Sequence, residues 1–305
     1  MVSGFRPASS VERTVIALAK AFLWLLSLLP SQAPLWIAGR CAGLWMHASP
    51  GKRRVTVANL TACFPDMNAQ DREQLVKDSF AHYVCSILET GRNWYWPMPR
   101  LHALCDDNRG IDLLGQSRKK GRGVVILAPH FGAWEYLGFY LQEQTDMAIL
   151  YKPPSDPGLE KALLEKRRRA GALMLPATAS GLRKLFNHIR EGKMGGVLPD
   201  QQPSAGQGHF APLFGVPALT GVLVPRLVQR TGCVVLFAAC QRLTGGRMRI
   251  HILPADKAIY SDDMDAALAA VNRGVEACIA IDPAQYLWSY KRFRARPEGQ
   301  PSLYR

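Results

Sequence analysis

From residue 120 onward, short apolar runs alternate with amphipathic stretches. The apolar runs lie at residues 123–128, 147–151, 195–199, 233–240 and 248–253. Each has the length of a buried strand. The amphipathic stretches, which have the length of helices, lie at residues 133–142, 159–170, 181–191, 221–230 and 262–281. This alternation predicts an α/β fold with a mostly parallel central sheet and helices on both faces.

The first fifty residues have a different composition, which is largely apolar and rich in tryptophan. Residues 14–29 contain one charged side chain, Lys20, and Pro30 follows them. Because a membrane span needs about 20 apolar residues, this run suits a kinked span or an interfacial hairpin; a buried helix of a soluble domain is the alternative. We predict an N-terminal apolar membrane helix. The chain then divides into a membrane-anchoring or interfacial segment, residues 1–50, and a catalytic domain, residues 51–305.

The chain is strongly basic, with 38 Lys and Arg against 24 Asp and Glu and a net charge of +14. Such a field favours anionic partners: nucleic acid, anionic lipid or an acidic protein. Positive charge also recurs after the apolar segment, at Arg40 and residues 52–54, and this bias would hold the following domain on the cytoplasmic side of a membrane. The seven scattered cysteines include no C-x-x-C pair, which favours reduced thiols over a disulfide framework or a zinc site.

Polar side chains follow three of the predicted strands. His130, Lys152 and Asp200 come within two residues of the ends of the runs at 123–128, 147–151 and 195–199. Sheets of this class bind their ligands beyond the carboxyl ends of the strands. We therefore expect the three side chains to share one site.

His130 and Glu135 are five positions apart in the segment APHFGAWE, residues 128–135. Positions i and i+5 of a helix do not share a face, so we expect His130 in the loop and Glu135 one turn into the helix. The Glu135 carboxylate could then fix the imidazole tautomer and leave the other ring nitrogen free to accept a proton. This is the base and orienter of a catalytic triad, with the nucleophile supplied by a hydroxyl of the substrate. The spacing is not H-E-x-x-H, so no metal is implied.

The longer segment APHFGAWEYLG resembles the H-x4-D/E block of the glycerolipid and lysophospholipid acyltransferase superfamily. More narrowly, the chain resembles the bacterial lipid A biosynthesis acyltransferases, which add secondary acyl chains. Five further segments match that family in order. They are RRVTVANLTACFPD (53–66), RRRAGALML (167–175), GGVLPDQQP (195–203), FAPLFG (210–215) and QYLWSYKRFRARPEG (285–299). Six ordered matches are far more specific than the H-x4-E spacing alone.

The resemblance implies an activity and a location. A fatty acyl group would pass from acyl carrier protein to a hydroxyl of a lipid A precursor, with His130 as general base assisted by Glu135. The enzyme would work at the membrane surface, on the cytoplasmic face of the inner membrane of a Gram-negative bacterium. No metal or redox cofactor is implied. The positive charge would serve to dock the acidic carrier protein and to hold anionic lipid.

The resemblance also implies substrate-binding residues. Arg167 and Arg169 would each clamp a phosphate of the acceptor or of the carrier's phosphopantetheine. Asp200 would hold a basic residue or the acceptor headgroup, and Lys152 is a further candidate for a phosphate contact. The alternative for the arginines is a solvated helix face, and for Asp200 a turn that caps a loop.

Other functions stay open at this point. The nearest is an acyltransferase with another acceptor, such as a lysophospholipid or an amino-acid lipid. A non-catalytic basic module that binds a membrane or nucleic acid is an alternative of another class, although no pattern typical of nucleic-acid-binding folds supports the second version. An esterase or thioesterase would want a G-x-S-x-G elbow, and the sequence has none.

Overall fold

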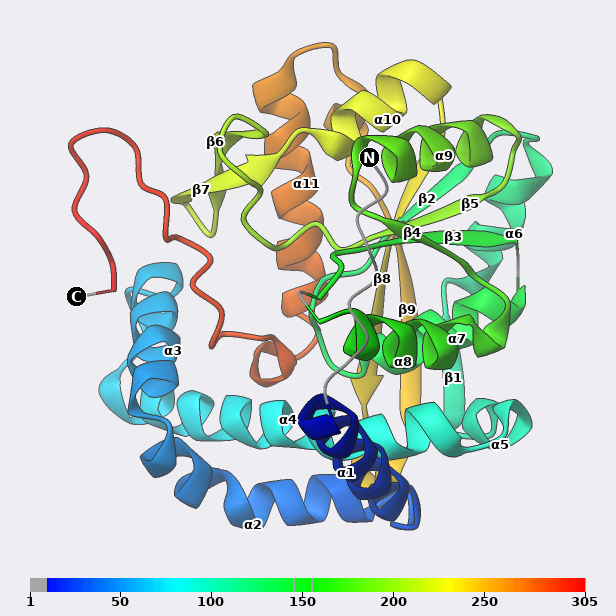
Figure 1. Ribbon diagram of the computed structural model, residues 1–305. Coiled ribbons are helices and arrows are strands. Elements are labelled where there is room, and N and C mark those ends of the chain that lie inside the picture. Colours follow the sequence, from blue (N-terminus) through cyan, green and yellow to red (C-terminus); the bar gives the residue numbers. More distant parts are fainter. Residues whose placement is uncertain (1–9, 145, 155, 305) are drawn as a thin grey trace.

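The computed structural model describes residues 10–144, 146–154 and 156–304. A central sheet of seven strands and a separate two-stranded hairpin lie within these ranges (Figure 1). The sheet strands are β1 (Cys105–Arg109), β2 (Val124–Leu127), β3 (Met147–Tyr151), β4 (Leu173–Pro176), β5 (Met194–Val197), β8 (Val234–Arg242) and β9 (Met248–Pro254). The hairpin strands are β6 (Gly208–Leu213) and β7 (Val216–Gly221). The five apolar runs correspond to β2, β3, β5, β8 and β9.

Helices connect and cover the strands. The α-helices in the described ranges are α1 (Ser10–Ser27), α2 (Ala33–Ala48), α3 (Pro50–Cys63), α4 (Ala69–Tyr95), α5 (Met98–His102), α6 (Ile111–Lys119), α7 (Trp134–Gln144), α8 (Pro157–Arg167), α9 (Ala179–Arg190), α10 (Leu223–Thr231) and α11 (Met264–Ile279). Single 3-10 turns are η1 (Arg168–Ala170), η2 (Thr244–Gly246), η3 (Lys257–Tyr260) and η4 (Pro283–Gln285). Local chemistry sets several starts: Asp156, Thr178 and Asp263 cap α8, α9 and α11 by accepting from first-turn N–H groups.

The sheet is mostly parallel, in the order β1-β9-β8-β2-β5-β3-β4. Strands β4, β3, β5, β2 and β8 run in one direction, β9 is antiparallel to β8, and β1 is parallel to β9. Successive side chains of a strand point to opposite faces. Val124 and Ile126 therefore pack with α7, while Val125 and Leu127 pack with α9, α10 and α11. The predicted α/β fold, with a mostly parallel sheet and helices on both faces, is confirmed.

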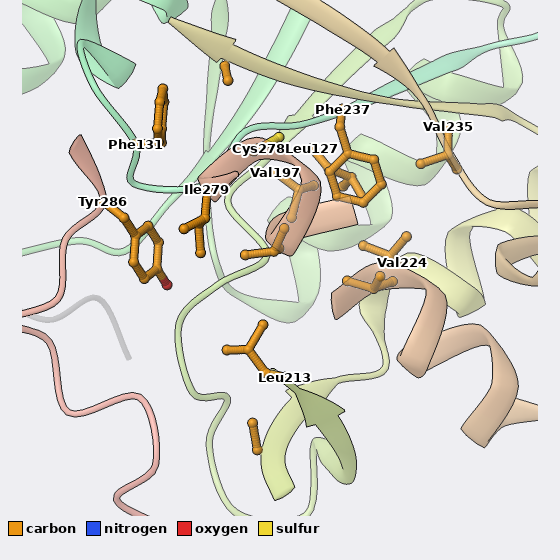
Figure 2. Close-up of a cluster of buried hydrophobic side chains, with 14 of the residues drawn as sticks. Leu127, Phe131, Val197, Leu213, Val224, Val235, Phe237, Cys278, Ile279 and Tyr286 are labelled. Carbon is orange, nitrogen blue, oxygen red and sulfur yellow. The ribbon is translucent and has the colours of Figure 1, made fainter. Parts of the chain in front are cut away.

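The larger core lies between the sheet and α11, and its side chains come from both (Figure 2). Phe237 of β8 is fully buried there, beside Leu127 of β2 and Val197 of β5. Helix α11 passes so close that a Cβ at Gly274 would lie 2.1 Å from the Phe237 ring. This dense packing holds the carboxyl ends of β2 and β5 in fixed relative positions.

Helices α1 and α2 lie along α4 at one edge of the molecule (Figure 1). Trp96 Nε1 donates to the Ser27 carbonyl oxygen at 2.6 Å, and Arg92 Nη1 donates to the Ser31 carbonyl oxygen at 3.0 Å. These bonds attach the turn between α1 and α2 to the end of α4. The division of the chain at residue 50 stays a prediction.

The spanning form of the predicted N-terminal membrane helix is not found, because no helix among the described residues is long and apolar enough to cross a membrane. The 18 residues of α1 span about 27 Å at a rise of about 1.5 Å per residue, and they include the charged residues Glu12, Arg13 and Lys20. Pro30 then follows the helix, and the chain turns back into α2. The predicted apolar run, residues 14–29, lies in α1 and in the turn that follows it, and it ends before α2 begins.

Candidate active site

Parallel pairing of β2 with β5 brings two distant segments together. The register pairs Leu127 with Val197, so His130 and Asp200 each lie three residues beyond a paired position. Equal offsets on neighbouring parallel strands place the two side chains at the same edge of the sheet. Both are largely buried: the side chain of His130 is 14% exposed and that of Asp200 3%.

Asp200 holds His130 at two points. Its Oδ1 lies 2.9 Å from His130 Nδ1, and its Oδ2 accepts from the His130 backbone N–H at 2.9 Å. A carboxylate at Nδ1 favours the tautomer with the proton on that nitrogen, and Nε2 keeps its lone pair for accepting a proton. The expectation that Glu135 fixes the tautomer is therefore corrected, because Asp200 occupies that place. The expectation that Asp200 holds a basic residue agrees with the geometry.

The buried pair shifts both pKa values. Burial alone would lower the pKa of His130, but the facing Asp200 carboxylate and its hydrogen bond outweigh burial and raise it. Burial would raise the pKa of Asp200, but the charge and the hydrogen bonds of His130 lower it. His130 is therefore a stronger base than an ordinary histidine, and Asp200 stays ionised opposite it.

Glu135, in the first turn of α7, pairs with Arg167 at the end of α8. Its Oε1 and Oε2 accept from Arg167 Nε and Nη2, both at 2.9 Å. Burial alone would lower the pKa of Arg167, but the Glu135 carboxylate and its hydrogen bonds raise it, so the guanidinium stays charged. Arg167 Nη1 has no hydrogen-bond partner in the described part of the chain. This donor is available to a ligand.

Backbone hydrogen bonds fix the loop between His130 and α7. The N–H of Gly132 donates to the Gln285 carbonyl oxygen and that of Ala133 to the Cys240 carbonyl oxygen, both at 2.9 Å. Gly132 has a φ of 53°, and a Cβ there would lie 1.9 Å from the Cys240 oxygen. Only glycine fits such a position. His130 is thus held in place before any substrate arrives.

The two remaining candidates lie in different surroundings. Lys152 directly follows β3, is exposed, and lies on the wall of the cavity that contains His130. Arg169 donates from Nη1 and Nη2 to the carbonyl oxygens of Trp96 and Asn93, at 2.6 and 2.7 Å. Since a helix C-terminus leaves carbonyl groups without partners, Arg169 serves to cap the end of α4. The structure does not bring it to the site.

His130, Glu135 and Arg167 line a cavity of about 1110 Å³. The residues that line the cavity come from both faces of the sheet, and they form two groups that we call its branches. The branch under α7 is lined by apolar residues: Ile126, Leu137, Gly138, Leu141, Met147 and Ile149. The branch toward α9 and α10 is apolar inside and basic at its rim, formed by Leu182, Phe186, Val224, Arg183, Arg190, Arg226 and Arg230. Such a volume accommodates a ligand with a long apolar tail.

The sequence pattern did not single out Gln201, which contacts Nε2 of His130. Its Nε2 lies 3.2 Å from His130 Nε2, and the side chain is exposed. A substrate hydroxyl that approached Nε2 would displace this amide. Its position directly after Asp200 was the available signal. Among the described residues, no three or more His, Cys, Asp or Glu side chains are grouped so as to hold a metal ion.

Comparison with known proteins agrees with the resemblance noted in the sequence. The model of the bacterial lipid A biosynthesis acyltransferase family matches residues 2–295. The lipid A biosynthesis lauroyltransferase of Escherichia coli K12 is 28% identical over 284 residues, which cover 92% of each chain. The lipid A biosynthesis palmitoleoyltransferase of the same strain is 29% identical over 287 residues, which cover 92% of each chain. Its lipid A biosynthesis myristoyltransferase is 27% identical over 275 residues, which cover 88% of this chain and 82% of that relative. The chain therefore belongs to the bacterial lipid A biosynthesis acyltransferase family, and the acyltransferase class that the resemblance implied is confirmed.

Proposed function

We propose that the protein transfers a fatty acyl group from the thioester of acyl carrier protein to a hydroxyl of a lipid A precursor, at the cytoplasmic face of the inner membrane. The observation that carries this proposal is the His130–Asp200 pair, held at one end of a branched, largely apolar cavity. An oriented base beside a long apolar chamber suits a hydroxyl nucleophile and a fatty acyl group. Family membership supplies the class of acceptor.

His130 acts first as base and then as acid. The acceptor hydroxyl gives its proton to Nε2 of His130 while its oxygen attacks the thioester carbonyl carbon. Asp200 stabilises the imidazolium that forms. The tetrahedral intermediate collapses, the C–S bond breaks, and the proton passes from Nε2 to the leaving thiolate. The products are the new ester and the free thiol of the carrier.

Glu135 has a positioning role in this scheme. It holds the guanidinium of Arg167 by two hydrogen bonds, and Arg167 lies on the cavity wall with Nη1 available. A fixed cation beside the reacting carbonyl would stabilise the oxyanion of the intermediate, or a phosphate of either substrate. Both residues are therefore assigned to the site, although Glu135 does not contact His130.

The test of the proposed function is a transfer assay with purified protein. The substrates are acyl carrier protein loaded with labelled saturated acyl groups and a tetra-acylated lipid A precursor, and products are weighed by mass spectrometry. A lipid product heavier by one acyl group would support the proposal. Acylation of a lysophospholipid in place of the lipid A precursor would contradict the acceptor, and release of free fatty acid alone would contradict transfer.

The acyl group is assigned to the branch under α7. Its walls come from α7 and from residues of β2, β3 and β5 that face this helix. Gly138 of α7 lines it, and a Cβ there would meet no atom nearer than 3.8 Å, the Nε2 of Gln142. Gly196 of β5 lines it from the opposite side. The missing side chain at Gly138 leaves room for methylene groups on the helix side, while the space above Gly196 is filled by the Met147 side chain.

Gly138→Leu is expected to shorten the preferred acyl chain. The leucine side chain would occupy part of the branch, and each methylene excluded from an apolar site costs about 0.8 kcal/mol, or about fourfold in kcat/KM. The measurement is competition among acyl carrier thioesters of graded chain length. Gly115→Leu is the matched control, because Gly115 is an exposed glycine of α6 with no atom within 4 Å of its Cβ position. An unchanged chain-length profile for Gly138→Leu would assign the acyl group to another branch.

Helices α1 and α2 present large apolar side chains to solvent. On α1, Leu18, Phe22 and Leu25 are 66%, 54% and 55% exposed, and their i, i+4, i+7 spacing places them on one face. On α2, Trp36 and Leu44 are 64% and 76% exposed. A contiguous apolar face of this kind marks an interaction site. We assign it to the membrane interface, where tryptophan rings lie at the headgroup level.

Leu18→Ser combined with Leu25→Ser is expected to weaken binding to lipid vesicles by about a hundredfold. Burying one leucine side chain contributes at least about 1.5 kcal/mol, or roughly tenfold, and two residues of one face act together. Sedimentation with vesicles of phosphatidylglycerol and phosphatidylethanolamine measures the change. Leu173→Ser combined with Phe210→Ser is the control, because these exposed apolar residues lie on β4 and β6. If both double variants lost the same amount of vesicle binding, the exposed face of α1 would not be the membrane-binding surface.

A further inference from the structure

Two neighbouring helices, α9 and α10, carry arginines in regular positions. Arg183 and Arg190 are seven residues apart on α9, and Arg226 and Arg230 are four residues apart on α10. Both spacings place a pair on one side of its helix. All four side chains are exposed, and all four line the rim of the cavity that contains His130. The two pairs therefore form one cationic surface around one entrance, called here the arginine rim.

The arginine rim has no acidic counterpart of its own. Neither helix contains an Asp or Glu, and the four arginines make no ion pair within the described residues. The guanidinium of Arg230 lies over the Phe186 ring, with its Cζ 5.6 Å from the ring centroid. Some arginines elsewhere on the surface do have such a partner: Arg53, Arg247 and Arg273 each pair with a carboxylate. Four like charges held together without counter-ions repel one another, and an anionic partner would relieve this repulsion.

The position of the arginine rim selects the kind of partner. Helices α9 and α10 lie at the opposite end of the molecule from α1 and α2, whose exposed apolar side chains are assigned to the membrane (Figure 1). With α1 and α2 on the lipid, the arginine rim points away from the headgroups and into the aqueous phase. A soluble macromolecule can reach it there, while a lipid headgroup in the membrane plane cannot.

We propose that the arginine rim of α9 and α10 is the docking surface of the acidic carrier protein that delivers the acyl thioester. This inference rests on the proposed function, since it concerns the donor of that reaction. The carrier's acidic surface would lie across Arg183, Arg190, Arg226 and Arg230. Its prosthetic arm would enter the branch between the two helices and bring the thioester to His130, with the acyl chain continuing into the branch under α7. Donor and acceptor then approach His130 from different ends of the molecule.

The experiment compares two charge-reversal variants with the wild type: Arg183→Glu with Arg190→Glu, and Arg226→Glu with Arg230→Glu. Each is expected to raise the KM for acyl carrier thioester by about tenfold or more, with a much smaller change in kcat. Transfer from the same acyl group on pantetheine, which lacks the carrier, is expected to fall by less than about threefold. Wild-type kcat/KM for the carrier substrate should decrease as salt is added, and the variants should lose most of that dependence. Lys77→Glu with Lys119→Glu is the control: it makes the same change in net charge at two exposed lysines on α4 and α6.

Several outcomes would overturn the inference. An unchanged KM for the carrier substrate in both variants would exclude the arginine rim as its docking surface. A raised KM for the lipid acceptor, with the donor KM unchanged, would assign the rim to the acceptor phosphates. Equal losses with the carrier and pantetheine donors would indicate damage to the site itself. These results differ from failure of the proposed function, in which the wild type would transfer no acyl group from the carrier at all.

Discussion

His130→Ala is expected to lower kcat for acyl transfer by about 10³ or more, while the protein stays folded. The imidazole is the group placed to take the hydroxyl proton, and general base catalysis contributes roughly 10² to 10⁴. Removing it also leaves the Asp200 carboxylate without its partner, so thermal unfolding must be measured beside activity. A folded His130→Ala variant that retains a tenth of the wild-type rate would contradict the mechanism.

The pH dependence of activity is expected to distinguish the roles of the two carboxylates, when the variants Asp200→Asn and Glu135→Gln are compared with the wild type. The pKa of His130 is raised in the folded protein, so the loss of activity on the acid side, where the base becomes protonated, begins above the pH of an ordinary histidine. Asp200→Asn removes the charge that raises this pKa, and the acid limb should move to lower pH as kcat falls. Glu135→Gln should lower kcat with a much smaller shift of that limb, because Glu135 pairs with Arg167. A larger shift in Glu135→Gln than in Asp200→Asn would restore Glu135 as the partner of the histidine.

Glu89→Ala is expected to lower the free energy of unfolding by about 3–5 kcal/mol, the cost of breaking a buried ion pair by removing one partner. Glu89 of α4 accepts from Arg92 at 2.7 Å and from Arg242 of β8 at 2.9 Å, with all three side chains at most 4% exposed. Burial alone would raise the pKa of Glu89, but the two guanidinium groups outweigh burial and lower it. Alanine would leave two positive charges buried together without a counter-ion. Urea unfolding of the purified protein measures the loss.

The control for this prediction is Glu73→Ala. Glu73 pairs with Arg53 at 2.9 Å, but the two side chains are 52% and 43% exposed, and exposed pairs contribute about 1 kcal/mol or less. The two variants should therefore differ by several kcal/mol. Similar stabilities would mean that the surroundings of Arg242 relax or admit water when Glu89 is removed.

The strands that could be predicted are those whose side chains are buried on both faces. Strands β2, β3, β5, β8 and β9 show as apolar runs because helices cover them on each side. Strand β1 has the sequence CDDNR and lies at the edge of the sheet, with partly exposed side chains, so no apolar pattern marks it. Strand β4 has four residues at the other edge. The order of the strands is set by pairing across the chain, which no local pattern records.

The absence of strand order from local patterns also explains why Glu135, and not Asp200, was predicted as the partner of His130. Glu135 is close in sequence, and local spacing favoured it as the orienter. Asp200 is 70 residues away and reaches the imidazole because β2 and β5 are neighbours in register. His130, Asp200 and Lys152 were correctly expected at one edge of the sheet, since that follows from the α/β class alone. Arg169 looked like its neighbour Arg167, and only the carbonyl groups at the end of α4 distinguish their roles.

The close approach of Gly132 to the Cys240 carbonyl has a consequence for how signature motifs are interpreted. Every residue with a Cβ collides there, so selection would act against any replacement of glycine at position 132. In the proposed reaction no atom of Gly132 takes part. Constancy of the whole segment across related sequences would therefore combine two kinds of constraint, the chemistry of one side chain and the steric tolerance of the backbone beside it.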